Sequence, residues 1–454
     1  MSQSVTVHEG TTTVPKKGNY RWLVIALICV TYCVAYADRA NLGVALPSIT
    51  KEFNLTNTEA GALVSILFFC YSFIQIPAGF LYTKVKVGKL FPVSMIMTCV
   101  FTALQGFTSS VFMMKLYRAG LGLVEGPLPA GCYILMNNWL PPKEKGIATG
   151  AFTGTSKFGA VLAPPIGAYI LVTFGDWRPI FWFFAIPGLI LTVLWYFMIT
   201  DTPAESKFVS PAELEYIQTG EDITNQVAER SKPKYNLAWL DKIIRAKKVD
   251  LVDTSAGVFK SWDIMGNAIA YFFMIGIFNV IMAWIPTYLV TVKGFATIKM
   301  GFLASAPFIG AVAGNFCGGI ISDRLLDKRR KPLQLLTTLS TSFMMYSLVY
   351  APNNETLLGG LLFLTGFLLS IGYWTFSTYP MGLTTKKTYG LAYSVANTGG
   401  QIGGALIPIV VGMILDNYNW DAVFLFLAAS SIVSFLILTT LVEPINDIVT
   451  TESA

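Results

Sequence analysis

The sequence predicts an all-α membrane protein with twelve transmembrane helices in two bundles of six. Three observations lead to this prediction. Hydrophobic residues make up 54% of the 454 residues and charged residues only 13%, whereas a soluble domain has about 25% charged residues. The apolar residues form twelve runs that each approach or exceed the roughly 20 residues needed to cross a bilayer. One long polar stretch, residues 200–262, divides these runs into six plus six.

The apolar runs define the expected elements and regions. The predicted spans are 20–46, 59–82, 89–109, 111–138, 146–173, 178–199, 264–291, 299–322, 333–351, 356–382, 388–414 and 421–442. The expected regions are a cytosolic tail (1–18), an N-terminal six-helix bundle (19–199), a cytosolic middle loop (200–262), a C-terminal six-helix bundle (263–443) and a second cytosolic tail (444–454).

Lysine and arginine are unevenly distributed between the two sets of short loops. The loops on the side of the termini carry Lys84, Lys86, Lys89, Lys143, Lys145, Arg324, Lys328, Arg329, Arg330, Lys331, Lys386 and Lys387. The loops on the other side carry Lys51, Arg178, Lys293 and Lys299. Because cytoplasmic loops are enriched in Lys and Arg, both termini and the middle loop are predicted to be cytoplasmic.

The composition argues against an enzyme. The one histidine, His8, lies in the N-terminal tail, and the six cysteines form no C-x-x-C pair, so we expect neither a metal site nor a disulfide framework. The sequence contains no nucleotide-binding loop of the G-x-x-x-x-G-K-[ST] type. We therefore expect no catalytic residues, no cofactor and no nucleic-acid partner, and we attribute the net charge of +6 to the cytoplasmic loops.

Five ionisable side chains lie deep within the predicted spans, all in the first half of the chain. They are Asp38, Arg39, Arg118, Glu125 and Lys157. A charge within a span costs at least about 2.5–3.5 kcal/mol, so it usually faces a polar cavity and has a function. Paired bundles with a site near the midplane are typical of secondary transporters. We therefore predict a site between the halves, charged on its N-terminal wall. The alternative is that these charges form structural ion pairs between helices.

The charged residue types indicate an organic anion and a proton. Arginine binds carboxylates through two parallel charge-assisted hydrogen bonds. Carboxylates suit proton coupling because their proton affinity depends on hydration and on nearby cations. Arg118 and Glu125 are seven residues apart, about 10 Å along one helix face, so each needs another partner. Lys157 is expected either to pair with Glu125 or Asp38, or to contact a second anionic or hydroxyl group of the substrate.

The second half contributes uncharged candidates for the same site. Amide and aromatic side chains within its spans include Asn279, Tyr373, Trp374, Asn397 and Gln401. A few polar groups among aromatic rings suit a polyhydroxylated ligand. For each aromatic residue, packing or anchoring at the membrane interface is the alternative explanation.

Three stretches resemble a known family. They are YADRANLGVALPSI (36–49), YSFIQIPAGFL (71–81) and RAGLGLVEGPLPA (118–130). With the six-plus-six layout, they are similar to the anion:cation symporter family of the major facilitator superfamily, whose members include bacterial hexuronate, glucarate and galactonate transporters. The resemblance implies the major facilitator fold and proton-coupled import of an organic anion of the sugar-acid type. The expected protein is a monomer in the bacterial inner membrane.

The resemblance also assigns roles to individual residues. It implies substrate contacts for Arg39, Arg118, Tyr36, Tyr71, Trp374 and Asn397, and proton-coupling or gating roles for Asp38 and Glu125. Ser156, next to Lys157, replaces a glutamine of the sugar-acid members, and Tyr373 replaces a smaller hydroxyl residue. The extra cation indicates a substrate with an additional acidic group. The family's gating loop follows the second span, where Thr83 replaces the usual aspartate. In the equivalent loop after the eighth span, Asp323 is kept and is followed by Arg324.

Other functions remain open from the sequence. One is an anion exchanger or uniporter for another carboxylate or an organic phosphate, in which Asp38 and Glu125 would be less important. Another is a transporter-like sensor that binds an anion without moving it. The middle loop shows no evident partner module.

Overall fold

The structure is a computed structural model that describes residues 18–219 and 238–445, except 328 and 386. Most of both predicted tails, His8 and part of the middle loop (220–237) therefore lie outside the described residues. Within the helices, the side chains of Thr83, Lys143 and Asp323 are also outside the description.

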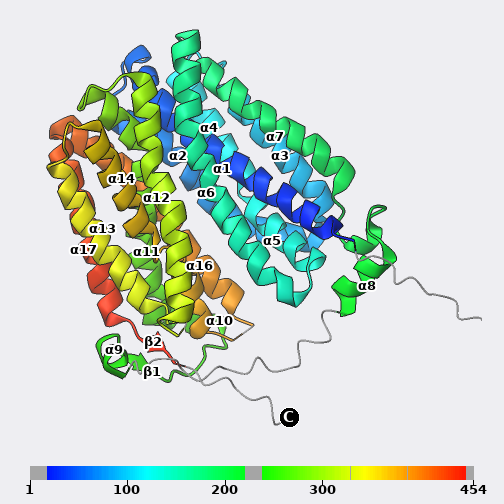
Figure 1. Cartoon of the computed structure of the whole chain (residues 1–454). Helices are drawn as coiled ribbons and strands as arrows, with labels where there is room; N and C mark the ends of the chain where they lie inside the picture. Colours follow the sequence, from blue (N-terminus) through cyan, green and yellow to red (C-terminus); the bar gives the residue numbers. More distant parts are fainter. Residues whose placement is uncertain (1–17, 220–237, 328, 386, 446–454) are drawn as a thin grey trace, which may run out of the picture.

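Long helices dominate both halves of the chain (Figure 1). The N-terminal half contains α1 (Tyr20–Glu52), α2 (Asn57–Lys84), α3 (Val87–Gln105), α4 (Val111–Glu125), α5 (Pro127–Trp139), α6 (Pro142–Phe174) and α7 (Arg178–Met198). The C-terminal half contains α11 (Trp262–Thr291), α12 (Thr297–Arg324), α13 (Lys331–Val349), α14 (Glu355–Ser370), α15 (Thr375–Thr378), η3 (Tyr379–Gly382), α16 (Tyr389–Asn417) and α17 (Trp420–Thr440).

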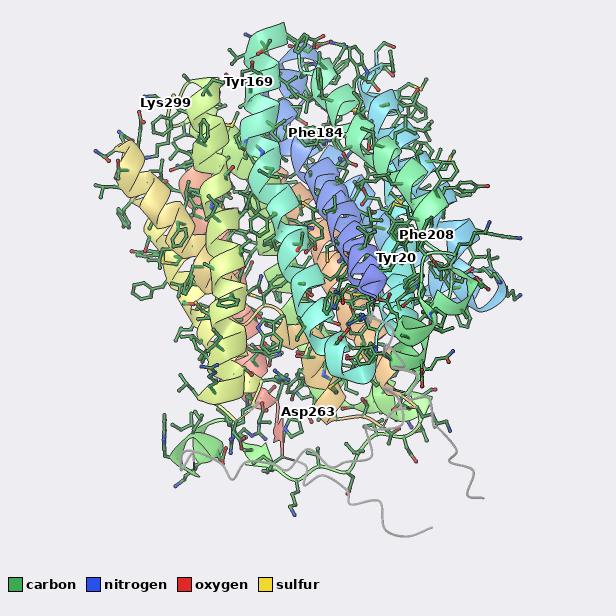
Figure 2. All side chains as sticks on the ribbon, turned by 45° about the vertical axis from the view of Figure 1, so that its right-hand side comes forward. Tyr20, Tyr169, Phe184, Phe208, Asp263 and Lys299 are labelled. Carbon is green, nitrogen blue, oxygen red and sulfur yellow. The ribbon has the colours of Figure 1, made fainter. Side chains whose placement is uncertain are left out.

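Short elements connect the halves and follow the last helix. They are η1 (Pro203–Glu205), α8 (Pro211–Thr219), α9 (Ala238–Ile243), β1 (Ala246–Lys247), α10 (Ser255–Lys260) and β2 (Glu443–Pro444). Strands β1 and β2 pair in parallel. We call the side with these elements the connector side and the opposite side the far side. Figure 2 shows Tyr20, Phe208 and Asp263 toward the connector side, and Tyr169 and Lys299 toward the far side.

The predicted twelve-span layout is confirmed, although one helix is less apolar than the rest. Among the described residues, eleven helical segments are long and apolar enough to cross a membrane. The twelfth is α13, whose buried hydroxyls lower its hydropathy. Two of these hydroxyls donate to backbone carbonyls: Thr338 to the Gln334 carbonyl (2.9 Å) and Ser342 to the Ala428 carbonyl on α17 (3.0 Å).

The fourth and tenth predicted spans are interrupted. The fourth is divided into α4 and α5 at Gly126, because Pro127 has no N–H to donate to the preceding helical turn. A Cβ at Gly126 would lie 2.0 Å from the Ile74 side chain, so this bend packs tightly on α2. The tenth span ends at Ser370, and a turn, α15 and η3 complete it.

The described part of the middle loop begins with a segment that packs against the N-terminal half. The start of α8 is fixed by Glu213, which is fully buried and accepts hydrogen bonds from the backbone N–H groups of Tyr20 and Arg21. The Arg21 guanidinium also donates to Glu213 (3.0 Å) and to Glu144 at the start of α6 (2.7 Å). This part of the connector is thus bound to the N-terminal half by buried charges.

The two halves are in backbone contact toward the far side. A Cβ at Gly61 on α2 would lie 2.4 Å from the carbonyl oxygen of Pro408 on α16. A Cβ at Gly43 on α1 would lie 2.6 Å from the carbonyl oxygen of Met282 on α11. At both places only glycine permits this approach. In Figure 1 the ribbons of α6 and α12 lie side by side, and Ser305 of α12 donates to the Val161 carbonyl of α6 (2.7 Å).

Candidate functional site

A buried ion pair joins α1 and α4 at the centre of the predicted site. The Nε of Arg39 donates to the Glu125 carboxylate at 2.6 Å, and both side chains are buried. Glu125 is the last residue of α4 and directly precedes the bend at Gly126. The bend therefore fixes the position of the carboxylate that Arg39 meets.

Aromatic rings surround the Arg39 guanidinium. Its Cζ lies 4.6 Å from the ring centre of Tyr71 on α2 and 5.1 Å from that of Tyr36 on α1. These are cation–π distances, and desolvated contacts of this kind are worth about 2 kcal/mol. Rings and carboxylate together hold the guanidinium in one place.

Several polar atoms around the ion pair have no protein partner among the described residues. They include Nη2 of Arg39, Oε1 of Glu125, Oδ1 of Asp38 and Nδ2 of Asn279. Most buried polar atoms in proteins are hydrogen-bonded. Free donors and acceptors close to a buried ion pair are therefore the groups that a polar ligand or a proton would engage.

A cavity lies between the two halves beside this ion pair. Its lining residues come from α1, α2, α11, α16 and the turn after α14: Tyr36, Arg39, Phe68, Ile275, Phe278, Asn279, Met282, Tyr373 and Gln401. Five predicted substrate contacts (Tyr36, Arg39, Asn279, Tyr373 and Gln401) thus line one cavity. The arginine is on the N-terminal wall, and the amides come from the C-terminal half.

Lys157 on α6 points toward the same cavity. Its Nζ lies 4.1 Å from the ring centre of Phe278, 5.0 Å from that of Tyr36 and 5.1 Å from that of Tyr373. Within the described part of the chain, no carboxylate lies within ion-pair distance of this ammonium. Of the two expected environments for Lys157, the pair with Glu125 or Asp38 is therefore not seen.

Other predicted contacts lie outside the cavity lining. Arg118 is fully buried, and its Nε donates to the Leu63 carbonyl of α2 (3.2 Å). Ser156 donates to the Thr153 carbonyl in its own helix (2.7 Å). The Trp374 ring lies under the guanidinium of Arg330, 4.6 Å from its Cζ. Local sequence placed these residues in spans but could not show which way each side chain turns.

Asn397 contacts the opposite half directly. Its Nδ2 donates to the Oε1 of Gln75 on α2 at 2.7 Å, so one hydrogen bond joins α16 to α2. The sequence analysis missed Phe278, which lines the cavity, and Gln75, the partner of Asn397. Gln75 carried a signal, since it is an isolated amide in an apolar span. Phe278 carried none. Arg324 ends α12, is exposed and is not among the residues that line the cavity.

Comparison with known proteins identifies the family. The profile of the Major Facilitator Superfamily matches residues 28–407 and 299–452. The chain belongs to the Major Facilitator Superfamily. Its relatives and structural neighbours are transporters, so the predicted fold and the prediction of a transporter rather than an enzyme are confirmed.

Curated superfamily relatives cover nearly the whole chain. A probable galactarate/D-glucarate transporter of Escherichia coli (strain K12) is 28% identical over 442 residues, which is 93% of this chain and 94% of the relative. A D-galactonate transporter of E. coli O6:H1 is 26% identical, with 93% and 95% covered. A probable sulfoacetate transporter of Cupriavidus necator is 27% identical, with 87% of each covered.

Solved superfamily structures match the fold at lower sequence identity. The crystal structure of a D-xylose–proton symporter gives a TM-score of 0.68 at 16% identity, covering 93% of this chain and 98% of that one. A bacterial homologue of the human lysosomal transporter Spinster, in an inward-facing conformation, also gives 0.68, at 14% identity and with 93% and 96% covered. At these identities the match concerns the fold alone.

Proposed function

We propose that this transporter imports an organic anion of the sugar-acid type together with a proton by alternating access. The observation that carries the proposal is the ion pair of Arg39 and Glu125 at the cavity wall, in which each partner keeps one unbonded atom. Relatives that are named galactarate/D-glucarate and galactonate transporters support the sugar-acid class.

The pair offers a physical route to coupling. While Glu125 is ionised, it occupies the Arg39 guanidinium that a substrate carboxylate would use. Protonation of Glu125 would weaken this bond and free the arginine for the substrate, so proton binding and anion binding favour each other. Asp38, buried in the next position on α1 with one unbonded oxygen, is the second candidate proton carrier.

The proposed cellular setting is the bacterial inner membrane, with the protein as a monomer and both termini cytoplasmic. The loops of the connector side carry most of the short-loop Lys and Arg residues, which favours the cytoplasm for that side. The far-side contacts at Gly61 and Gly43 then close the outer end of the cavity. Asp323 and Arg324, at the connector-side end of α12, are proposed as part of the gate that closes the inner end.

Uptake into proteoliposomes tests the proposal. Labelled galactarate and galactonate are supplied with and without an inward proton gradient to the unaltered chain, Asp38→Asn and Glu125→Gln. We expect concentrative uptake that needs the gradient and is lost in at least one carboxylate variant, while counterflow exchange persists. Gradient-independent exchange that survives both substitutions would instead establish an exchanger, and saturable binding without flux would establish a sensor.

A further inference from the structure

Two cations of the site, Arg118 and Lys157, have no ion-pair partner among the described residues once the pair of Arg39 and Glu125 is accounted for. Three buried cations, Arg39, Arg118 and Lys157, lie in the spans of the first half with two buried carboxylates, Asp38 and Glu125. With all five ionised, the set carries a net charge of +1. With one carboxylate protonated, as symport requires, the net charge is +2. A substrate with two negative charges neutralises the protonated set, whereas a monoanion leaves one charge over.

Of these two cations, Arg118 donates to a backbone carbonyl, whereas the Lys157 ammonium lies among aromatic rings. Three aromatic rings lie within 5.1 Å of the Lys157 Nζ, from Tyr36 in the first half and from Phe278 and Tyr373 in the second. Aromatic faces attract an ammonium but accept no strong hydrogen bonds from its three N–H donors. An anionic oxygen in the cavity would accept hydrogen bonds from these donors. A ligand can therefore take over from the rings as the partner of the Lys157 ammonium.

The position of Lys157 relative to Arg39 limits the ligand. The Lys157 Nζ and the Arg39 Cζ lie 5.0 and 5.1 Å from the centre of the same Tyr36 ring, so they are at most about 10 Å apart. For a ligand that lies between the two cations, a charge-assisted hydrogen bond of about 2.8 Å at each end leaves at most about 4 Å between its acidic groups. This is the spacing of a short dianion, or of a longer one that bends within the cavity.

We propose that Lys157 binds a second acidic group of the substrate, so that this transporter selects organic dianions over monoanions of similar size. The inference deepens the proposed function and rests on it in placing the substrate beside Arg39. The comparisons alone do not decide the matter, since galactarate and sulfoacetate are dianions and galactonate is a monoanion, and relatives are named for all three.

The test measures binding to the purified full-length chain by calorimetry. The ligands are galactarate and galactonate, which differ mainly in the second carboxylate, with sulfoacetate and acetate as a shorter pair. Lys157→Gln should weaken galactarate or sulfoacetate binding about 10- to 100-fold, because one charge-assisted hydrogen bond is lost. Galactonate binding should change less than about threefold. Lys157→Arg, which keeps the charge, should retain the preference for dianions, and Arg39→Gln should weaken both classes.

The outcomes separate this inference from the proposed function. Three outcomes would overturn the role of Lys157. The unaltered chain could bind dianion and monoanion with equal affinity, Lys157→Gln could weaken both equally, or neither dianion could bind. Sulfoacetate binding that depends on Lys157, without binding of either sugar acid, would support the dianion site and reject the sugar-acid class. Thermal unfolding of Lys157→Gln with and without galactonate or acetate shows whether the variant is folded.

Discussion

Asp416 on α16 caps the start of α2 through Thr58, and in doing so it joins the two halves of the transporter. One carboxylate oxygen of Asp416 accepts hydrogen bonds from the Thr58 backbone N–H (2.9 Å) and hydroxyl (2.6 Å). The other oxygen accepts from the Asn57 backbone N–H (2.8 Å) and side-chain amide (3.0 Å). The first N–H groups of a helix have no acceptor within the helix. For α2, Asp416 of the opposite half supplies this acceptor.

The first prediction is that Asp416→Asn weakens far-side closure. The variant loses the negative charge that favours a helix N-terminus and part of a cap worth about 0.5–2 kcal/mol. We expect the population closed on the far side to fall by about three- to tenfold. Spin-label distances between the start of α2 and the end of α16 should report this change. Asp421→Asn is the matched control, because Asp421 is exposed at the start of α17 on the same side and belongs to the half that carries Asp416. An equal response in both variants would contradict the prediction.

The second prediction concerns the hydrogen bond between Asn397 and Gln75. Because it joins α16 to α2 beside the cavity, removing either partner should change the apparent substrate affinity by about two- to tenfold, corresponding to about 0.5–1.5 kcal/mol. Asn397→Ala, Gln75→Ala and the double variant should have similar uptake constants, since each breaks the same bond. Effects that add in the double variant would show that the two amides act separately.

The third prediction concerns two residues that cap each other's helices on the connector side. Both oxygens of buried Glu443 accept backbone N–H groups at the start of α13, from Arg330 (2.9 Å) and Lys331 (2.7 Å). The Lys331 ammonium in turn donates to the Leu441 carbonyl just beyond α17. Glu443→Ala should lower stability by about 3 kcal/mol, measured as a lower melting temperature in detergent. Glu205→Ala, whose partner Lys86 is exposed, should change it little.

The fourth prediction is the pH dependence of this cap. Burial raises the pKa of Glu443 above its usual value, against the opposing effect of its two backbone hydrogen bonds. The folded protein therefore binds this proton more tightly than the unfolded chain. Proton binding by Glu443 contributes its whole stabilisation of the folded state below the pKa of the unfolded chain, about 4.3. This contribution is lost as the pH rises through the higher pKa of the folded state. Relative to Glu443→Gln, the unaltered chain should gain stability as the pH falls. A flat difference would argue against it.

The fifth prediction is that Arg21→Gln releases α8. The substitution leaves Glu213 buried without its cationic partner, and breaking a buried pair in this way costs about 3–5 kcal/mol. Amide hydrogen exchange in residues 211–219 should become at least tenfold faster, while exchange in the long helices is unchanged. Lys86→Gln breaks an exposed pair and serves as the control. Unchanged protection of α8 in Arg21→Gln would show that apolar packing holds it.

The spans and the charged wall could be predicted because both depend on local sequence. Long apolar runs reveal the helices, and a charge such as Arg39 within a run stands out whatever its neighbours are. The interruption at Gly126 also has a signal in the sequence, since Pro127 follows this glycine and proline interrupts a helix. The apolar signal is weakest for α13, because this helix carries several buried hydroxyls, two of which donate to backbone carbonyls.

The contacts within the site could not be predicted, because they depend on which helices adjoin. Arg39 and Glu125 are 86 residues apart, and nothing near either residue identifies the other. Lys157 meets Phe278 from the opposite half, a residue that looks like any apolar residue of its span. Trp374 and Arg118 belong to the predicted set. The turn after α14 directs Trp374 to Arg330, and the rotation of α4 directs Arg118 to the Leu63 carbonyl.

The glycine contacts between the halves have a consequence for energy conservation. At Gly61 and Gly43, a backbone carbonyl of one half lies where a side chain of the other would begin. Such contact leaves no room there for a file of water molecules, and protons cross proteins along such files. A carrier driven by a proton gradient must block that leak whenever its cavity is open to the opposite side. In the proton-coupled import proposed above, one added methyl group at either glycine would hold the halves apart and let the proton gradient leak away.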